Sequence, residues 1–301
     1  MPGSQLPVLE KVANLRDVAL STASPLLKPG LLLRSAAPDD ATPNDRNLLA
    51  SELGLQTIID LRSDTEHREV IKKNALRVPP VPDPPVKEHP AQDGINHTAP
   101  QDPARIPGVK YELINFNGSA YTRHLIWQLS YFNIAKLLTW YTLGYSNDAI
   151  SIIATNVMQK RGLVGLAQDS LHLCKAEVRL VFDVLASKES YPLLVHCTQG
   201  KDRTGLVILL VLMLLGVDHA AIEKDYMLSE QGLALDRDKR VEAITKVGFP
   251  DEFADCAKDW AQTVIATIEK EHGGIEKYLT SCEVDVAQQK QVRESLSQDV
   301  A

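Results

Sequence analysis

The 301-residue chain is 44% hydrophobic and 24% charged, so it can bury a substantial core and is not a disordered polypeptide. Its formal net charge of -7 argues against a nucleic-acid-binding protein, because contact with phosphate backbones normally needs a basic face. Residues 1–20 lack a secretory signal pattern, and the longest apolar run, residues 206–215, is too short to span a bilayer, so we expect no stable membrane insertion.

Three elements are predicted in the N-terminal part. A Pro-Gly turn precedes a short strand at residues 31–33, and a helix follows over residues 42–54, where leucines recur on one face. The β-branched run at residues 57–61 predicts a second strand, with Asp60 near its end. Polar residues at strand ends are where α/β folds place their chemistry.

The middle of the chain contains two unusual segments. Residues 79–108 hold nine of the 17 prolines, which predicts an irregular surface loop. After a strand at residues 109–116, residues 121–145 hold seven of the 16 aromatic residues in a helical pattern, within an insertion at residues 118–165. We expect this aromatic segment to be buried against the rest of the domain; a lid over a binding site and contact with a membrane surface are the alternatives.

The C-terminal half begins with a helical pattern over residues 167–185. A strand at residues 193–195, a polar loop and an apolar helix at residues 206–215 follow, and residues 220–301 are helical with breaks at glycines. Alternating strands and helices predict an α/β layered domain that ends in a helical part, all within a single domain.

The four cysteines are widely spaced, with no Cys-x-x-Cys pair and no clustered histidines that would suggest zinc. In a chain of this length they indicate reduced thiols, so we expect a cytoplasmic protein without a metal site. Their positions are Cys174, Cys197, Cys256 and Cys282.

The loop "HCTQGKDRTG" carries the strongest chemical signal. A loop between a strand and a helix N-terminus directs backbone N–H groups into one concavity, where the helix dipole adds positive potential, so it is suited to bind a dianion. The same field stabilises a thiolate and predicts a nucleophilic Cys197. Arg203 can hold two phosphoryl oxygens with its planar fork. Gly200 and Gly205 permit a tight backbone path, and Thr204 can donate a hydrogen bond to the sulfur.

A nucleotide-binding Walker loop is the competing motif, but Asp202 occupies the position where it needs a hydroxyl. The Cys-x5-Arg-Thr loop instead resembles that of cysteine-dependent protein tyrosine phosphatases, and most of all the microbial and fungal family with a Cys-x-x-Gly-Lys-Asp-Arg-Thr-Gly loop. Further blocks similar to that family occur in the same order, at residues 14–19, 28–38, 53–66 and 215–230.

The resemblance covers most of the chain and implies a three-layer tyrosine-phosphatase fold, with a central, mostly parallel sheet flanked by helices and a helical lid. It implies a two-step reaction in which Cys197 attacks phosphorus, Arg203 and the loop amides stabilise the equatorial oxygens, and water hydrolyses the thiophosphate. Thr198 and Gln199 would contribute to substrate binding. No metal or cofactor is required.

Two residues are candidates for the general acid. Asp202 lies inside the loop, in an order similar to that of myotubularin-like and Sac-like phosphoinositide phosphatases, and Asp60 lies in the Asp-Leu-Arg-Ser block. We favour Asp202 slightly, and the other carboxylate is expected to orient Arg203 or the loop.

Three basic residues are candidates for substrate contacts. Lys201, as a second cation beside Arg203, favours substrates with more than one phosphate or lipid headgroups. Arg34 and Arg62 lie at predicted strand ends, where they can contact phosphate; surface ion pairs with the acidic residues Asp39, Asp64 or Glu66 are the alternative.

We therefore predict a phosphatase for protein phosphotyrosine, with activity on phosphoserine, phosphothreonine or phosphoinositides as an extension. Its partners are then a phosphorylated protein or a phosphoinositide, and no nucleic acid. A phosphatase for small-molecule phosphate monoesters and a phosphate-binding pseudophosphatase are the alternatives, while the sequence leaves the oligomeric state open.

Overall fold

The computed structural model describes residues 6–74, 86–88 and 105–298. Within them, a six-stranded sheet has the order β1-β2-β6-β3-β5-β4, and all neighbouring strands are parallel except β1 and β2. The strands are β1 (Arg16–Asp17), β2 (Leu32–Ser35), β3 (Thr57–Asp60), β4 (Val86–Glu88), β5 (Lys110–Leu113) and β6 (Leu193–His196).

The three central strands β2, β6 and β3 are buried along their whole length, which is typical of parallel strands covered on both faces. Successive side chains point to opposite faces. Ile59 and Val195 therefore belong to the larger core cluster, whereas Ile58 and Leu194 belong to a smaller cluster on the other face. The predicted α/β fold with a mostly parallel sheet flanked by helices is confirmed.

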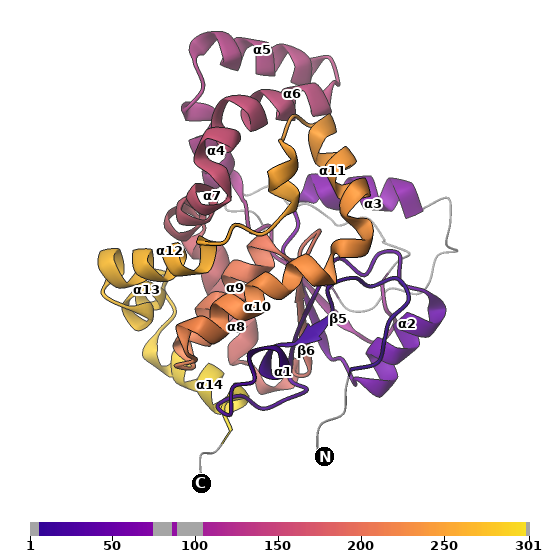
Figure 1. Cartoon of the computed structure of the whole chain (residues 1–301), viewed down its shortest axis with the longest axis vertical. Helices are drawn as coiled ribbons and strands as arrows, with labels where there is room; N and C mark the ends of the chain where they lie inside the picture. The colour runs from indigo at the N-terminus through magenta and orange to yellow at the C-terminus, as the bar shows by residue number, and fades with distance from the viewer. Residues whose placement is uncertain (1–5, 75–85, 89–104, 299–301) are drawn as a thin grey trace.

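Helices surround the sheet, as Figure 1 shows. Those before β6 are α1 (Val18–Thr22), α2 (Pro43–Asn47) with a π-helical continuation (Leu48–Glu52), α3 (Asp64–Asn74), α4 (Ser119–Trp127), α5 (Tyr131–Thr142), α6 (Ser146–Ile153) with a π-helical turn (Ala154–Met158), α7 (Gln159–Leu173) and α8 (Lys175–Ala186). Those after β6 are α9 (Asp202–Leu214), α10 (His219–Gly232), α11 (Arg237–Lys246), α12 (Trp260–Thr267) with a π-helical segment (Ile268–His272), α13 (Ile275–Ser281) and α14 (Val286–Leu296). Three 3-10 turns complete the list, at Lys188–Ser190, Ala234–Asp236 and Asp251–Ala254.

The predicted strands coincide with β2, β3, β5 and β6 within a few residues, and the helix predicted over residues 42–54 begins at a capping box formed by Thr42. The helical pattern predicted over residues 167–185 is confirmed, as two helices rather than one. Cys174, with φ -102° and ψ 30°, separates α7 from α8, although the apolar pattern continues across the break. The predicted Pro-rich loop lies mostly outside the described residues, and residues 86–88 within it form β4.

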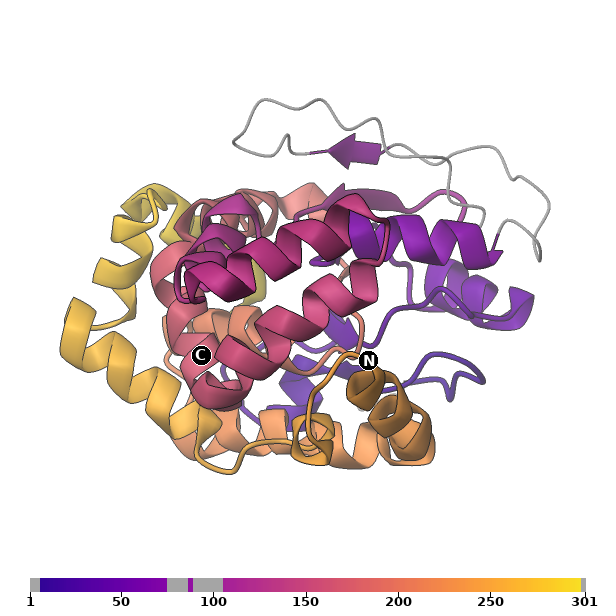
Figure 2. The ribbon, with the colours of Figure 1, turned by 90° about the horizontal axis from the view of Figure 1, so that it is seen from above.

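Helices α5 and α6 pack against each other at one end of the molecule, beyond the sheet, as Figures 1 and 2 show. The expected burial of the aromatic segment is wrong for most of its rings, although Tyr121 is buried. Leu137 is the buried residue of α5, because this helix has the neighbouring α6 on one side and solvent on the other. The exposed rings are Trp127, Tyr131, Phe132, Tyr141 and Tyr145.

The apolar run at residues 206–215 belongs to α9, which spans 13 residues and is buried almost throughout. Among the residues that the structure describes, no helix combines the length and hydrophobicity needed to cross a bilayer. The hydrophobicity of α9 therefore serves the core that supports the loop before it.

Candidate active site

One edge of the sheet gathers the candidate residues. Strand β6 lies between β2 and β3, and all three are parallel, so their carboxyl ends meet at this edge. Residues 197–201 leave β6 there and enter α9 at Asp202, while Ser35 ends β2 and Asp60 ends β3. The fold thus places the polar loop at the position where α/β folds bind ligands.

The tight path of the loop depends on Gly200. Its φ of +65° lies in the left-handed region, and a Cβ built there would lie 2.0 Å from the carbonyl oxygen of Ser35. No side chain fits in that space, because the obstructing atom is backbone. Gly205, in the first turn of α9, faces the Tyr226 ring, where an added Cβ would approach to 3.2 Å.

Hydrogen bonds hold the carbonyl groups of Gln199 and Gly200 on the outer side of the loop. The Asn14 side-chain amide donates to the carbonyls of Gln199 and Gly200, at 3.1 Å each, and Arg34 donates to the Gly200 carbonyl at 2.8 Å. In a trans peptide the N–H points opposite to the carbonyl, so the N–H groups of Gly200 and Lys201 face the other way, toward the interior of the loop. This is the arrangement that binds an anion with backbone amides.

Arg34 is a support beneath the loop in this structure. It is buried and pairs with Asp225 of α10, which also accepts from Arg16 at 2.9 Å. Burial alone would raise the pKa of Asp225, but Arg34 and Arg16 outweigh it and lower this pKa, so the carboxylate stays charged. Asn14 and Arg34 therefore act on the backbone of the loop.

The thiol of Cys197 begins the loop and is 3% exposed. His196, immediately before it, has Nδ1 3.1 Å from the Cys197 carbonyl oxygen and Nε2 3.5 Å from the Asp60 carboxylate. The imidazole thus joins the backbone at Cys197 to the end of β3.

The guanidinium of Arg203 is held by Glu66, at the start of α3. Nη1 and Nη2 each donate to one carboxylate oxygen of Glu66 at 2.8 Å, and Nη1 also donates to the Leu61 carbonyl at 3.2 Å. Thr198 donates its hydroxyl to the same carboxylate and lies 3.3 Å from Nη2. The side chains of Thr198, Arg203 and Glu66 therefore form one cluster at the mouth of the loop.

Glu66 is fixed locally as well as by Arg203. It forms a capping box with Ser63, whose N–H and hydroxyl each donate to Oε2 at 2.9 Å. Burial alone would raise the pKa of Glu66, but the hydrogen bonds and charge of Arg203 outweigh it and lower this pKa well below its ordinary value. Glu66 is thus a charged support, and its Ser-x-x-Glu capping-box signal was visible in the sequence although its pairing was not.

Asp60 lies in a buried network and not at the loop mouth. Arg62 donates to it from its backbone N–H at 3.0 Å and from Nη2 at 2.7 Å, and His67 Nε2 lies 3.0 Å away. Burial opposes ionisation, but His196, Arg62 and His67 outweigh it and hold the pKa of Asp60 well below its ordinary value. Arg62 also pairs with Asp39 at 2.6 Å, so its charge is fully engaged inside the protein.

The Lys201-Asp202 pair divides between the interior and the surface. Lys201 is buried, and its ammonium donates to the carbonyls of Phe253 and Asp255, at 3.0 and 2.6 Å. It therefore ties the loop to the 3-10 turn Asp251–Ala254. Asp202, the first residue of α9, is 42% exposed, and its Oδ1 lies 3.8 Å from the Lys201 ammonium.

Three polar side-chain atoms of residues 197–204 are buried without a hydrogen-bond partner among the described residues: the Thr204 hydroxyl, Oε1 of Gln199 and Oδ1 of Asp202. In sum, the structure brings Cys197, Thr198 and Arg203 together at the loop. The charged groups of Arg34, Arg62 and Lys201 are bound by other groups of this chain and do not face the interior of the loop. Asn14 and Glu66 are supports that the sequence alone did not assign.

This loop, on this sheet edge, defines a cysteine-dependent phosphatase. The sequence profile of the tyrosine phosphatase family matches residues 7–298, so the chain belongs to that family and is a phosphoric monoester hydrolase. The chain is 27% identical over 297 residues to the triple specificity protein phosphatase PtpB of Mycobacterium tuberculosis, covering 93% of this chain and 95% of that protein. It is 28% identical over 174 residues to a tyrosine-protein phosphatase of Nostoc commune, covering 51% of this chain and 58% of that protein.

Proposed function

We propose that this protein hydrolyses phosphotyrosine in protein substrates through a thiophosphate intermediate on Cys197. The observation that carries the proposal is the guanidinium of Arg203, held by Glu66 and Thr198 in the same loop as the nucleophile. Thr198, which immediately follows Cys197, lies 3.3 Å from Nη2 of Arg203, so the arginine is held beside the start of the loop. An anion bound between Arg203 and Cys197 meets a fixed cation, backbone amides and a nucleophile at once.

In the first step, the Cys197 sulfur bonds to phosphorus while the bond to the tyrosine oxygen breaks, and that oxygen takes a proton from the general acid. Arg203 stabilises the equatorial oxygens with Nε–H, which donates no hydrogen bond within the described part of the chain. In the second step, water attacks phosphorus and gives a proton to the carboxylate that acted as the acid, while the sulfur departs as a thiolate, to which the unpartnered Thr204 hydroxyl can donate.

We assign the general acid to Asp202. Its side chain is partly exposed at the N-terminus of α9, where a leaving group can reach it. Asp60 is enclosed and held as a carboxylate by Arg62 and His67, so it has no proton to give, and we assign it the ordering of β3 and the catalytic loop.

The proposed substrate range includes phosphoserine, phosphothreonine and phosphoinositides. The loop binds only the phosphoryl group, which these substrates share. In addition, a relative that matches nearly the whole chain is named a triple specificity protein phosphatase. Lys201 contributes to this range through the loop conformation, because its ammonium is occupied by the carbonyls of Phe253 and Asp255.

We also propose that residues 118–165 act as a lid. The exposed apolar side chains of α5, among them Tyr131, Phe132 and Tyr141, support it, since a helix that moves over a binding site needs an apolar face to cover it. Replacing Phe132 and Tyr141 with serine is then expected to change KM for a phosphotyrosine peptide more than it changes the inhibition constant of inorganic vanadate. Equal effects on the two constants would contradict the lid.

All four cysteines are buried and unpaired, which supports a cytoplasmic, reducing location.

Hydrolysis of p-nitrophenyl phosphate, phosphopeptides, phosphoinositide vesicles and phosphorylated metabolites tests the proposal, with vanadate as inhibitor. We expect fastest turnover on phosphotyrosine peptides, loss of turnover in Cys197→Ser, and full activity in the matched control Cys282→Ser. No turnover by the intact protein would indicate a phosphate-binding pseudophosphatase, and a preference for metabolites would indicate a small-molecule phosphatase.

A further inference from the structure

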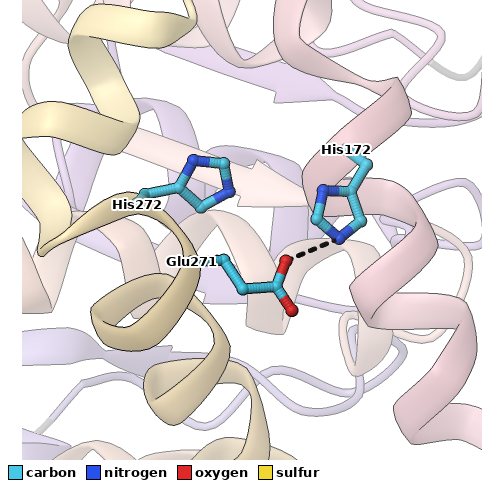
Figure 3. A group of neighbouring side chains, drawn as sticks. All are labelled: His172, Glu271 and His272. Carbon is cyan, nitrogen blue, oxygen red and sulfur yellow. Dashed lines mark ion pairs between the residues drawn. The ribbon is translucent and has the colours of Figure 1, made fainter.

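A cluster of two histidines and a glutamate lies on elements that do not form the catalytic loop. His172 is in the last turn of α7, and Glu271 and His272 end the π-helical segment that continues α12. Figure 3 shows the two imidazoles and the carboxylate converging on one space. His172 lies about a hundred positions before the adjacent pair Glu271 and His272, so the tertiary fold creates the cluster.

The backbones that carry the cluster are held together by separate contacts. Helices α7 and α12 pack against each other. The Tyr278 hydroxyl donates to the Leu171 carbonyl at 3.0 Å, and the Gln168 amide donates to the Thr267 hydroxyl at 3.0 Å. The cluster is thus set on a preformed scaffold, which lowers the ordering cost of binding a ligand there.

The distances fit a transition-metal ion. Nε2 of His172 lies 3.3 Å from Oε2 of Glu271, and one ligand atom from each of the three residues lies within 4.8 Å of the others. In a tetrahedral zinc site with bonds of about 2.0–2.1 Å, ligand atoms lie about 3.4 Å apart. One pair already has about this separation, and the ligand atom of His272 lies within 4.8 Å of both.

An ordinary ion pair does not account for His272. Its Nε2 is buried and has no hydrogen-bond partner among the described residues, although it faces the other two ligands. A buried polar atom without a partner is costly, and a metal ion would satisfy it. The pair His219 and Glu269 serves as a comparison: Nε2 of His219 lies 3.6 Å from Oε1 of Glu269, and both residues are exposed. No third ligand joins this pair in the described part of the chain.

We propose that His172, Glu271 and His272 bind one Zn²⁺ ion, with water completing the coordination. Two imidazoles and a carboxylate are donors that suit zinc, whereas magnesium and calcium prefer oxygen ligands alone. The ion links the end of α7, the helix in which residues 118–165 end, to the C-terminal helices. His172 and Glu271 are 43% and 48% exposed, so the ion exchanges with solvent.

Isothermal titration calorimetry with zinc chloride tests this site. The protein is the full chain without a histidine tag, in a Cys197→Ser background so that the catalytic thiolate cannot bind zinc. We expect one zinc per chain, with the Kd raised about 100-fold in His172→Ala, Glu271→Gln and His272→Ala, since even indirect partners of metal ligands typically contribute about 10- to 100-fold. The matched control His219→Ala keeps the parent Kd.

Thermal unfolding provides a second measurement on the same proteins. Zinc is expected to raise the Tm of the parent and of His219→Ala, and not that of His172→Ala or Glu271→Gln, whose exposed positions leave folding intact. No saturable binding by the parent, or an unchanged Kd in both exposed-site variants, would overturn the proposal and leave the cluster as an ion pair beside a half-buried histidine.

Discussion

Glu66→Gln is the substitution that tests the support of Arg203 most closely. The carboxylate accepts from both terminal nitrogens of Arg203 at 2.8 Å, and also from Thr198. Glutamine has nearly the same shape, but its amide has one acceptor oxygen and no charge. The variant therefore loses one charge-assisted hydrogen bond to Arg203 and leaves an amide N–H group facing the guanidinium.

The size of the effect follows from that loss. A hydrogen bond to a charged group contributes about 1.5–3 kcal/mol, and each 1.36 kcal/mol corresponds to a factor of about ten in rate. We expect kcat/KM for a phosphotyrosine peptide to fall about 10- to 150-fold, because Arg203 would no longer be oriented before substrate binds.

Steady-state kinetics on a phosphotyrosine peptide measures this, with Glu69→Gln as the matched control on the same helix, where the residue is exposed. The control is expected to keep wild-type kcat/KM. A Glu66→Gln variant whose kcat/KM stays within about twofold of wild type, a difference that amounts to less than about 0.5 kcal/mol, would refute the reasoning.

Three further predictions concern the acid, the pH and the lysine. Asp202→Asn is expected to slow hydrolysis of phenyl phosphate about 10²- to 10⁴-fold and of p-nitrophenyl phosphate much less; uniform slowing would exclude the acid role. Because folding lowers the pKa of Glu66 and Asp60, their stabilisation is complete above the unfolded values of 4.5 and 3.8 and is lost as the pH falls from these values through the lower folded ones. At pH values below about 4.5, the urea concentration at the unfolding midpoint should therefore fall, and it should fall less steeply with pH in Glu66→Gln than in the wild type. Equal slopes of midpoint against pH in the two proteins would contradict this. Lys201→Met should lower the Tm and the rates on all substrates together, and a selective loss on phosphoinositides would instead show direct headgroup contact.

The polar loop and its position between a strand and a helix could be predicted because both depend on local pattern. The strand before Cys197, the glycines and the arginine lie in one continuous stretch, and the apolar runs on either side identify a strand and a helix. The order of β2, β6 and β3 then places the loop at the carboxyl edge of the sheet.

The partners of the charged residues could not be predicted in this way. Arg203 and Glu66 are 137 positions apart, and Lys201 meets backbone carbonyls 52 and 54 positions later, so neither pairing has a local signature. Helical periodicity likewise shows which face of α5 is apolar but not whether another element covers it, which is why the exposure of Phe132 and Tyr141 was missed.

Detection of the covalent intermediate tests the central claim most directly. The protein is mixed with a phosphotyrosine peptide, quenched under denaturing conditions during turnover, and digested for mass spectrometry. We predict one added phosphoryl group on the peptide that contains Cys197, and none in Cys197→Ser. Turnover without any phosphorylated Cys197, or a phosphoryl group on another residue, would contradict the account.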